Sequence, residues 1–315
     1  MVANPPGGGD DTEAFSRAAP AGCTPLLDAG NVRALAVTSR ARSKVLPQSP
    51  AMDDPGPRGC VLRLWAGLMA SPAAVTSRSD QETDMTFAIA GRCERTGRFG
   101  VAISTNPVAV GARCPFVAPN VGVVVTMATT DPRLGPLGLN LLAQGFSASA
   151  TLAQIAGSDP RIEFRQICVI DRDGNAAART GANNKVWSGA VTRRNLVAMG
   201  NYLTSERTAQ AMAASWEATA ALDIDERLML GLEAGRDAGG QVGGQHSSGL
   251  KVYGTQIFPW VDLRVDHHPE PIAELRRIYD IHRPLLPYYY GRPGDPEAFG
   301  RENEWMEKQG KPYIL

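Results

Sequence analysis

The chain has 315 residues, of which 43% are hydrophobic and 20% are charged, a composition typical of a soluble globular protein. Its 32 basic and 32 acidic residues cancel, so no overall electric field would draw it to nucleic acid or to an anionic membrane surface. No apolar run approaches the roughly 20 residues that cross a bilayer. We therefore expect neither a nucleic-acid partner nor a membrane partner.

Residues 1–84 differ in character from the rest. They are rich in Pro, Gly, Ala, Ser and Arg and follow neither a strand nor a helix period, a composition that cannot bury enough apolar surface to offset ordering. The apolar patch at 61–70 is interrupted by Arg63 and lies far from the start, so it is no secretory signal. We predict that 1–84 is a disordered extension or a spurious one, because Met85 offers a later start.

From residue 85 the sequence alternates strand-like and helix-like segments. The predicted strands lie at 85–91, 100–105, 122–127, 164–170, 176–179, 186–191, 195–199, 248–253 and 260–265. The predicted helices lie at 139–144, 148–156 with Ser147 as its cap, 205–219, 225–238 and 271–281. The remaining segment, 283–315, is rich in Pro and Tyr and is predicted to be an irregular tail.

Hairpin turns at 95–98 and 172–175 require antiparallel pairing, and there are enough strands for two sheets. This pattern predicts an α+β fold, a four-layer αββα sandwich of two mainly antiparallel sheets over residues 85–282. The helices of 139–156 would cover one sheet and those of 205–238 the other. Alternation along the strands predicts that eight side chains are buried: Phe87, Ile89, Val101, Ile103, Val123, Val125, Ile167 and Val169.

Thr86 stands at the head of the first of these strands. N-terminal nucleophile hydrolases place a threonine there, whose hydroxyl attacks while its own α-amine acts as the general base. Thr86 can do this only when everything before it is removed, for example by a start at Met85 followed by loss of that methionine. The alternative is an ordinary β-branched strand residue.

Known cofactor and metal motifs are missing from the sequence. The glycine-rich segment 239–244 follows a helix instead of joining a strand to one, so it is neither a Rossmann turn nor a P-loop. His267 and His268 are adjacent and point in opposite directions on an extended segment, and no other histidine has ligand spacing to them. No Gly-x-Ser-x-Gly elbow carries a serine nucleophile. We predict no cofactor and no metal.

The five cysteines are odd in number, widely spaced and without a CxxC pair. This usage indicates neither a disulfide framework nor a zinc knuckle. We therefore expect a cytoplasmic protein.

Polar residues near strand ends are candidates for a binding site. Asp262, Arg264 and Asp266 alternate along a strand and share one face, where they would equally form a structural ion network. Asp131 follows a strand and could be a helix or turn cap. Asn201 follows Gly200 and would suit the left-handed geometry of a turn.

Several motifs occur in an order and spacing that resemble one known family. They are 86–89, 100–104, 110–115, 131–136, 141–147, 165–166, 180–181, 200–201 and 261–269. Together they resemble the DUF1028 family, a bacterial group of poorly defined activity placed in the N-terminal nucleophile (Ntn) hydrolase superfamily. The resemblance covers roughly residues 85–282, and members usually begin where Met85 stands.

This resemblance implies the αββα fold and makes Thr86 the candidate nucleophile. It also implies that five polar residues lie near a shared site: Asp131, Asn201, Asp262, Arg264 and Asp266. The chain departs from the family at Met127, where many relatives carry a glutamine that could donate to an oxyanion, and again at 246–250.

The leading hypothesis is an enzyme that hydrolyses a small amide. Thr86 would attack, Asn201 would help to hold the oxyanion, and Arg264 would increase the basic fraction of the α-amine, whose ordinary pKa is about 7.7–8.0. Asp131, Asp262 and Asp266 would bind the small-molecule substrate. The alternatives are a catalytically silent module that binds a small metabolite, and a structural subunit of a homo-oligomer whose Tyr-rich tail packs on its neighbour.

Overall fold

The structure of the protein is a computed structural model. It describes residues 2–3, 33–34, 85–184 and 187–312. The chain divides into two units, residues 1–82 and 83–315. In the first unit, strand β1 (Val2–Ala3) pairs antiparallel with β2 (Arg33–Ala34). The other residues of 1–84 are outside the described part of the chain, and so is the prediction that this segment is disordered or spurious.

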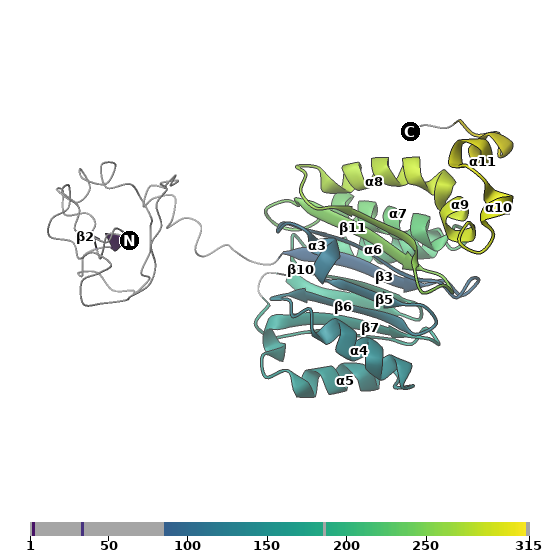
Figure 1. The fold of residues 1–315 in the computed structure, drawn as a ribbon. Helices are drawn as coiled ribbons and strands as arrows, with labels where there is room; N and C mark the ends of the chain where they lie inside the picture. The colour runs from purple at the N-terminus through teal and green to yellow at the C-terminus, as the bar shows by residue number, and fades with distance from the viewer. Residues whose placement is uncertain (1, 4–32, 35–84, 185–186, 313–315) are drawn as a thin grey trace, which may run out of the picture. The chain divides into compact units, whose positions relative to one another are not determined.

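The second unit contains a six-stranded antiparallel sheet (Figure 1), with strand order β12-β11-β4-β3-β10-β9. Its strands are β3 (Thr86–Arg92), β4 (Phe99–Thr105), β9 (Trp187–Arg193), β10 (Leu196–Leu203), β11 (Ser247–Tyr253) and β12 (Pro259–Val265). The strand that begins at Thr86 therefore lies inside this sheet, between β4 and β10.

A four-stranded antiparallel sheet lies against the first one, with order β5-β6-β7-β8. Its strands are β5 (Pro115–Ala118), β6 (Gly122–Ala128), β7 (Arg165–Asp171) and β8 (Ala176–Thr180). One apolar cluster fills the space between the two sheets, where Val101 and Ile103 of β4 join Val123 and Val125 of β6. Strand alternation sends these side chains to the shared face.

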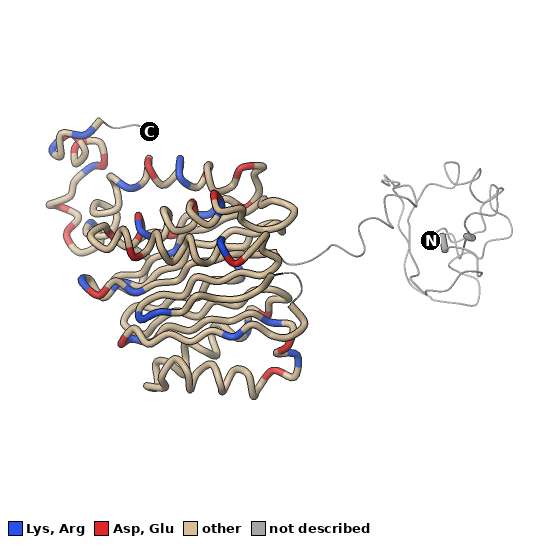
Figure 2. The backbone as a smooth tube through the Cα atoms, turned by 180° about the vertical axis from the view of Figure 1, so that it is seen from behind, with Lys and Arg blue, Asp and Glu red and all other residues tan. Residues whose placement is uncertain are grey.

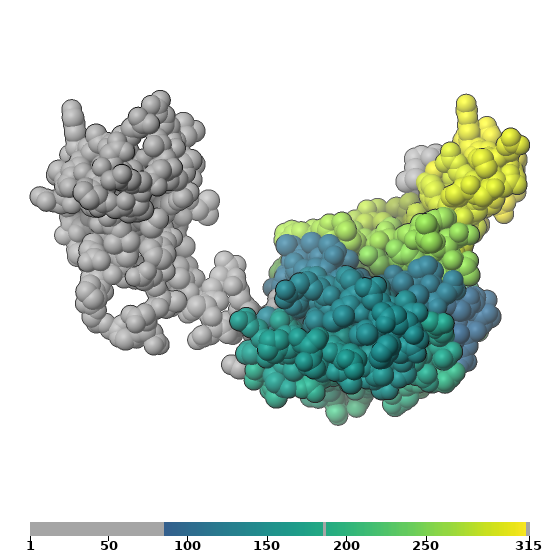
Figure 3. Space-filling model, turned by 60° about the horizontal axis from the view of Figure 1, so that its bottom comes forward, coloured from purple at the N-terminus to yellow at the C-terminus, as the bar shows by residue number. Residues whose placement is uncertain are grey.

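Helices cover both outer faces. Helices α4 (Leu134–Ala143) and α5 (Ala148–Ser158) pack on the four-stranded sheet and form the face turned forward in Figure 3. Helices α6 (Arg207–Ala218), α7 (Ile224–Asp237) and α8 (Pro271–His282) pack on the six-stranded sheet. This order of layers confirms the predicted αββα sandwich and the predicted role of each helix pair.

The predicted burial pattern is also confirmed. All eight predicted core side chains have no exposed surface. Phe87 and Ile89 face the helices, whereas Ala88 and Ala90 face the second sheet, as the two-residue period of a strand requires. Ser147 caps α5 as predicted, its hydroxyl accepting a hydrogen bond from the backbone N–H of Ala150 at 3.3 Å.

The prediction of an irregular tail is wrong. The residues up to 312 form η2 (Arg283–Leu285), α9 (Leu286–Gly291), α10 (Pro296–Phe299) and α11 (Glu302–Lys308). Prolines lie in the first turn of three of these helices, where a missing N–H has no intrahelical partner to lose. Tyr288 packs against Phe299 and Trp305, with ring centroids 6.1 and 5.6 Å apart.

Three short elements have no counterpart among the predicted ones: α3 (Val110–Arg113), η1 (Ile162–Phe164) and β5. Charged residues lie mainly on the helices, the loops and the strand ends (Figure 2), and a few, such as Lys251 and Asp262, lie inside strands. Among the described residues, no helix combines the length and apolar character needed to cross a membrane.

Candidate functional site

Thr86 is the first residue of β3 and has only 3% of its surface exposed. Met85 precedes it and is itself buried. In the six-stranded sheet, Thr86 lies opposite Thr105 of β4 on one side and Asn201 of β10 on the other. The strand pairing therefore surrounds Thr86 with polar side chains from two neighbouring strands.

The hydroxyl of Thr86 belongs to a short chain of hydrogen bonds. Its Oγ1 lies 2.9 Å from Oγ1 of Thr105, and the Thr105 hydroxyl donates to the backbone oxygen of Met85 at 2.5 Å. A hydroxyl has one proton to donate. Because Thr105 gives its proton to Met85, the Thr86 hydroxyl must be the donor to Thr105.

The backbone N–H of Thr86 donates a hydrogen bond to Oδ1 of Asn201, with 3.2 Å between the nitrogen and the oxygen. The amide nitrogen of Asn201 in turn donates to Oε1 of Gln166 at 3.1 Å. Both side chains are fully buried. Two hydrogen-bonded side-chain amides, Asn201 and Gln166, thus connect Thr86 to β7 of the second sheet.

The orientation of this amide pair follows from acceptors around Gln166. Its Nε2 lies within 2.9–3.1 Å of the backbone oxygens of Gly189 and Gly200 and of the hydroxyl of Thr180. Of the two ends of a glutamine amide, the NH2 group donates to backbone oxygens and the oxygen does not. The NH2 group of Gln166 therefore faces these oxygens, and its oxygen faces Asn201. Asn201 therefore presents its oxygen, and not its NH2 group, to Thr86.

The sequence thus pointed to Asn201 but assigned it the wrong hydrogen-bonding group. An amide oxygen accepts hydrogen bonds and cannot donate one to an oxyanion. Asn201 also lies within β10 rather than in a left-handed turn; the residue with a positive φ is the next one, Tyr202, at 53°.

Arg264 and Asp266 are brought together, but away from Thr86. They form a half-exposed ion pair at 3.3 Å. Arg264 lies opposite Gly249, which lies opposite Ile103 and then Ala88 of β3. Three strand spacings, about 14 Å, therefore separate the backbones of β12 and β3.

Asp262 and Asp131 also bind other partners. Asp262 pairs with Lys251 at 3.3 Å. Asp131 accepts hydrogen bonds from the backbone N–H and the side chain of Arg133 at the start of α4, at 3.0 and 2.6 Å. The Arg133 guanidinium lowers the pKa of Asp131 to about 2, which keeps this carboxylate charged as a local cap.

Two residues of the site were not among the sequence candidates. Thr105 could have been found by counting, because Thr86 and Thr105 lie equally far from the middle of the 95–96 turn and so face each other in the hairpin. Gln166 carries the weaker signal of one amide beside the apolar run 167–170 of β7. It lies opposite Met127, which is fully buried between the sheets.

Among the described residues, no group of three or more His, Cys, Asp and Glu side chains is arranged to hold a metal ion. His246 and His267 stack with ring centroids 5.8 Å apart. The side chains that contact Thr86 are the hydroxyl of Thr105 and the amide of Asn201.

The model of one protein family matches residues 86–275, more than half of the chain, and its description is a family of unknown function, DUF1028. The chain belongs to the DUF1028 family. The match begins at Thr86, the first residue of β3.

Two solved structures resemble this DUF1028 protein to different degrees. The DUF1028-family protein SPO2555 from Silicibacter pomeroyi is 30% identical, with a TM-score of 0.59, over 63% of this chain and 89% of that one. Anbu, an ancestral beta-subunit from Yersinia bercovieri, is 9% identical with a TM-score of 0.31, over 62% of this chain and 93% of that one. The second similarity is too weak to support an argument. No curated protein matches the chain.

Proposed function

We propose that this DUF1028 protein hydrolyses a small amide, with Thr86 as an N-terminal nucleophile once the preceding residues are removed. The observation that carries the proposal is the way Thr86 is held. Its hydroxyl is aligned by Thr105, and its backbone nitrogen is fixed by the oxygen of Asn201. A nucleophile and its base must both be oriented in this way.

In the exposed form, the backbone nitrogen of Thr86 becomes an α-amine. The side-chain oxygen of Asn201 accepts a hydrogen bond from one N–H of this amine. The lone pair of the amine is then free to take the proton from the Thr86 hydroxyl. Asn201 is then a positioning residue, and Gln166 fixes it. The proposal gives Arg264 no part, because its strand lies three places from β3 in the sheet and its side chain pairs with Asp266.

The geometry around Met85 also supports a route to that exposed terminus. The Met85 oxygen accepts hydrogen bonds from the Thr105 hydroxyl at 2.5 Å and from the backbone N–H of Asn106 at 3.3 Å. Such a pair of donors stabilises negative charge on a carbonyl oxygen.

Thr86 would add its hydroxyl oxygen to the Met85 carbonyl carbon while its proton passes through Thr105 to the carbonyl oxygen. The carbon–nitrogen bond then breaks and the nitrogen takes the proton back. This leaves Met85 as an ester on Thr86, which water hydrolyses. A start at Met85 with loss of that methionine would produce the same terminus.

Intact-mass measurement of the native protein tests the first half of the proposal. We expect the mass of residues 86–315, with threonine as the N-terminal residue. A chain that retains residues before Thr86 would overturn it, because the amide nitrogen of Thr86 is then no base.

A screen of small linear and cyclic amides tests the second half. Thr86→Ala should abolish hydrolysis and Thr86→Ser should retain part of it. Thr96→Ala, which changes an exposed threonine in the β3–β4 turn, should change nothing. If Thr86→Ala leaves the rate of an observed activity unchanged, the nucleophile assignment fails and a silent metabolite-binding module becomes the better account.

A further inference from the structure

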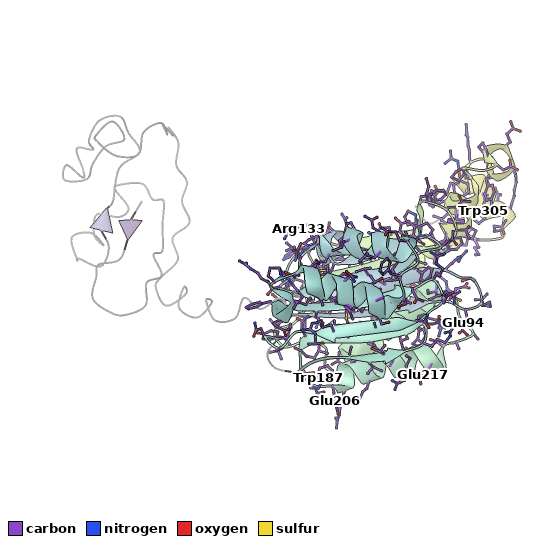
Figure 4. All side chains as sticks on the ribbon, turned by 90° about the horizontal axis from the view of Figure 1, so that it is seen from below. Glu94, Arg133, Trp187, Glu206, Glu217 and Trp305 are labelled. Atoms are coloured by element: carbon purple, nitrogen blue, oxygen red, sulfur yellow. The ribbon has the colours of Figure 1, made fainter. Side chains whose placement is uncertain are left out.

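A pocket of about 630 Å³ lies at the end of β3 remote from Thr86. It is built from the end of β3, the turn between β9 and β10, and helices α6 and α7. Thr86 and Arg92 are the two ends of the seven-residue strand β3, a distance of about 20 Å. Figure 4 shows two of the lining residues, Glu94 and Glu217, at one end of the unit, with Trp187 and Glu206 at the other.

The lining of this pocket is strongly basic. Five arginines and two glutamates line it. Because Arg95 pairs with Asp223 at 2.8 Å, an excess of two positive charges remains, although the whole chain is neutral. The pocket therefore concentrates positive charge that the rest of the molecule balances elsewhere. Clefts lined by one sign of charge focus the electric field and attract ions of the opposite sign.

The floor of the pocket holds a buried arginine without a counterion. Arg227 is only 7% exposed and its guanidinium stacks on the ring of Trp216 at 3.6 Å. One of its nitrogens donates to the Trp216 backbone oxygen at 2.7 Å, but its Nε is buried without a partner. Among the described residues, no carboxylate forms an ion pair with it.

Burying an unpaired charge is costly unless another group compensates it. Burial lowers the pKa of Arg227, because it disfavours the charged form. A second lining arginine, Arg92, also has a buried Nε without a partner. Both Nε atoms lie beneath the pocket lining, where no protein acceptor among the described residues satisfies them.

Two arginine side chains at the rim of the pocket form only weak ion pairs. Arg193 and Arg194 are more than half exposed, and their ion pairs with Glu217 and Glu94 are long, at 3.9 and 3.7 Å. Exposed pairs of this kind contribute little. Both side chains can therefore turn toward a ligand at small cost.

We propose that this pocket binds a small molecule through a phosphate or pyrophosphate group. The planar guanidinium group of arginine binds two oxygens of a phosphate group at once, and a group with more than one negative charge can compensate the excess of two. A single carboxylate could not. The volume lies in the range of small-molecule sites. The site is separate from Thr86, so it stands independently of the proposed hydrolase.

The test is calorimetric titration of the full-length protein with sodium pyrophosphate and with inorganic phosphate at constant ionic strength. We expect saturable binding and a rise in the melting temperature. Changing both Arg193 and Arg194 to Gln should weaken pyrophosphate binding at least tenfold, about 1.4 kcal/mol, without lowering the melting temperature of the free protein. Arg207→Gln is the matched control, because it removes an exposed charge elsewhere on α6.

Arg227→Lys completes the test, since it keeps the positive charge but removes the planar guanidinium group that binds two oxygens at once. It should weaken binding, while Thr86→Ala should leave binding unchanged. Absence of saturable binding at millimolar pyrophosphate, or equal binding by the rim variant, would overturn the proposal. Acetate binding as tightly as pyrophosphate, or a DNA duplex binding more tightly, would also overturn it, because each points to another class of ligand.

Discussion

The buried amide pair behind Thr86 makes a quantitative prediction about stability. Gln166→Leu keeps the side-chain volume nearly constant, so the loss from altered packing is small. It removes three hydrogen bonds: the one that Asn201 donates, and the two that the Gln166 NH2 group can donate among Gly189, Gly200 and Thr180. At a net value of about 1 kcal/mol for each bond, the free energy of unfolding should fall by about 3 kcal/mol.

This loss would be a large part of the 5–15 kcal/mol that typically stabilises a domain. Gln210→Leu is the control, because Gln210 lies exposed on α6. Its effect should stay within about 0.5 kcal/mol. Asn201→Leu should also destabilise. Because Asn201 and Gln166 are bonded to each other, the double variant should lose less than the sum of the two single variants, by about 1 kcal/mol.

Urea unfolding followed by tryptophan fluorescence measures these differences from the shift of the midpoint at constant slope. If Gln166→Leu costs less than about 1 kcal/mol, or no more than Gln210→Leu, the reasoning is refuted, because the amide orientation would then not be fixed by Gln166. Strict additivity of the double variant would show that Asn201 and Gln166 do not interact.

Three further predictions concern other parts of the fold. Asn201→Asp should raise the pKa of an exposed Thr86 α-amine, because a carboxylate stabilises the ammonium form, and should shift the pH–rate profile upward; an unchanged profile would separate Asn201 from the amine. Asp131→Asn should cost about 2 kcal/mol at pH 7 in urea unfolding. The pKa of Asp131 is lowered to about 2, so this contribution is present above about pH 4 and lost as the pH falls toward 2; an equal loss at pH 2 would contradict it. Gly91→Ala should lower stability by about 1–3 kcal/mol, since its Cβ would lie 2.3 Å from the Trp216 ring, and calorimetry should show weaker pyrophosphate binding.

Local patterns were enough to predict most secondary structure, because they depend on residues close together in the chain. The hairpin around 95–98 places Thr86 opposite Thr105 by counting alone. The tail was mispredicted for a related reason. The Pro- and Tyr-rich composition of 283–315 predicted an irregular segment, whereas the prolines lie in the first turns of short helices. The packing of Tyr288 on Phe299 and Trp305 stabilises these helices.

The sequence by itself determined the layers of this protein: alternation fixed which faces of the strands are buried, and helix periodicity supplied the outer layers. Only the tertiary structure decided which polar residues meet. Sheet order separates the strand of Arg264 from the strand of Thr86 by three strand spacings, about 14 Å. It also places Gln166 beside Asn201, 35 residues away in sequence. The direction of an amide depends on acceptors contributed by other strands, and a local pattern contains no information about those neighbours.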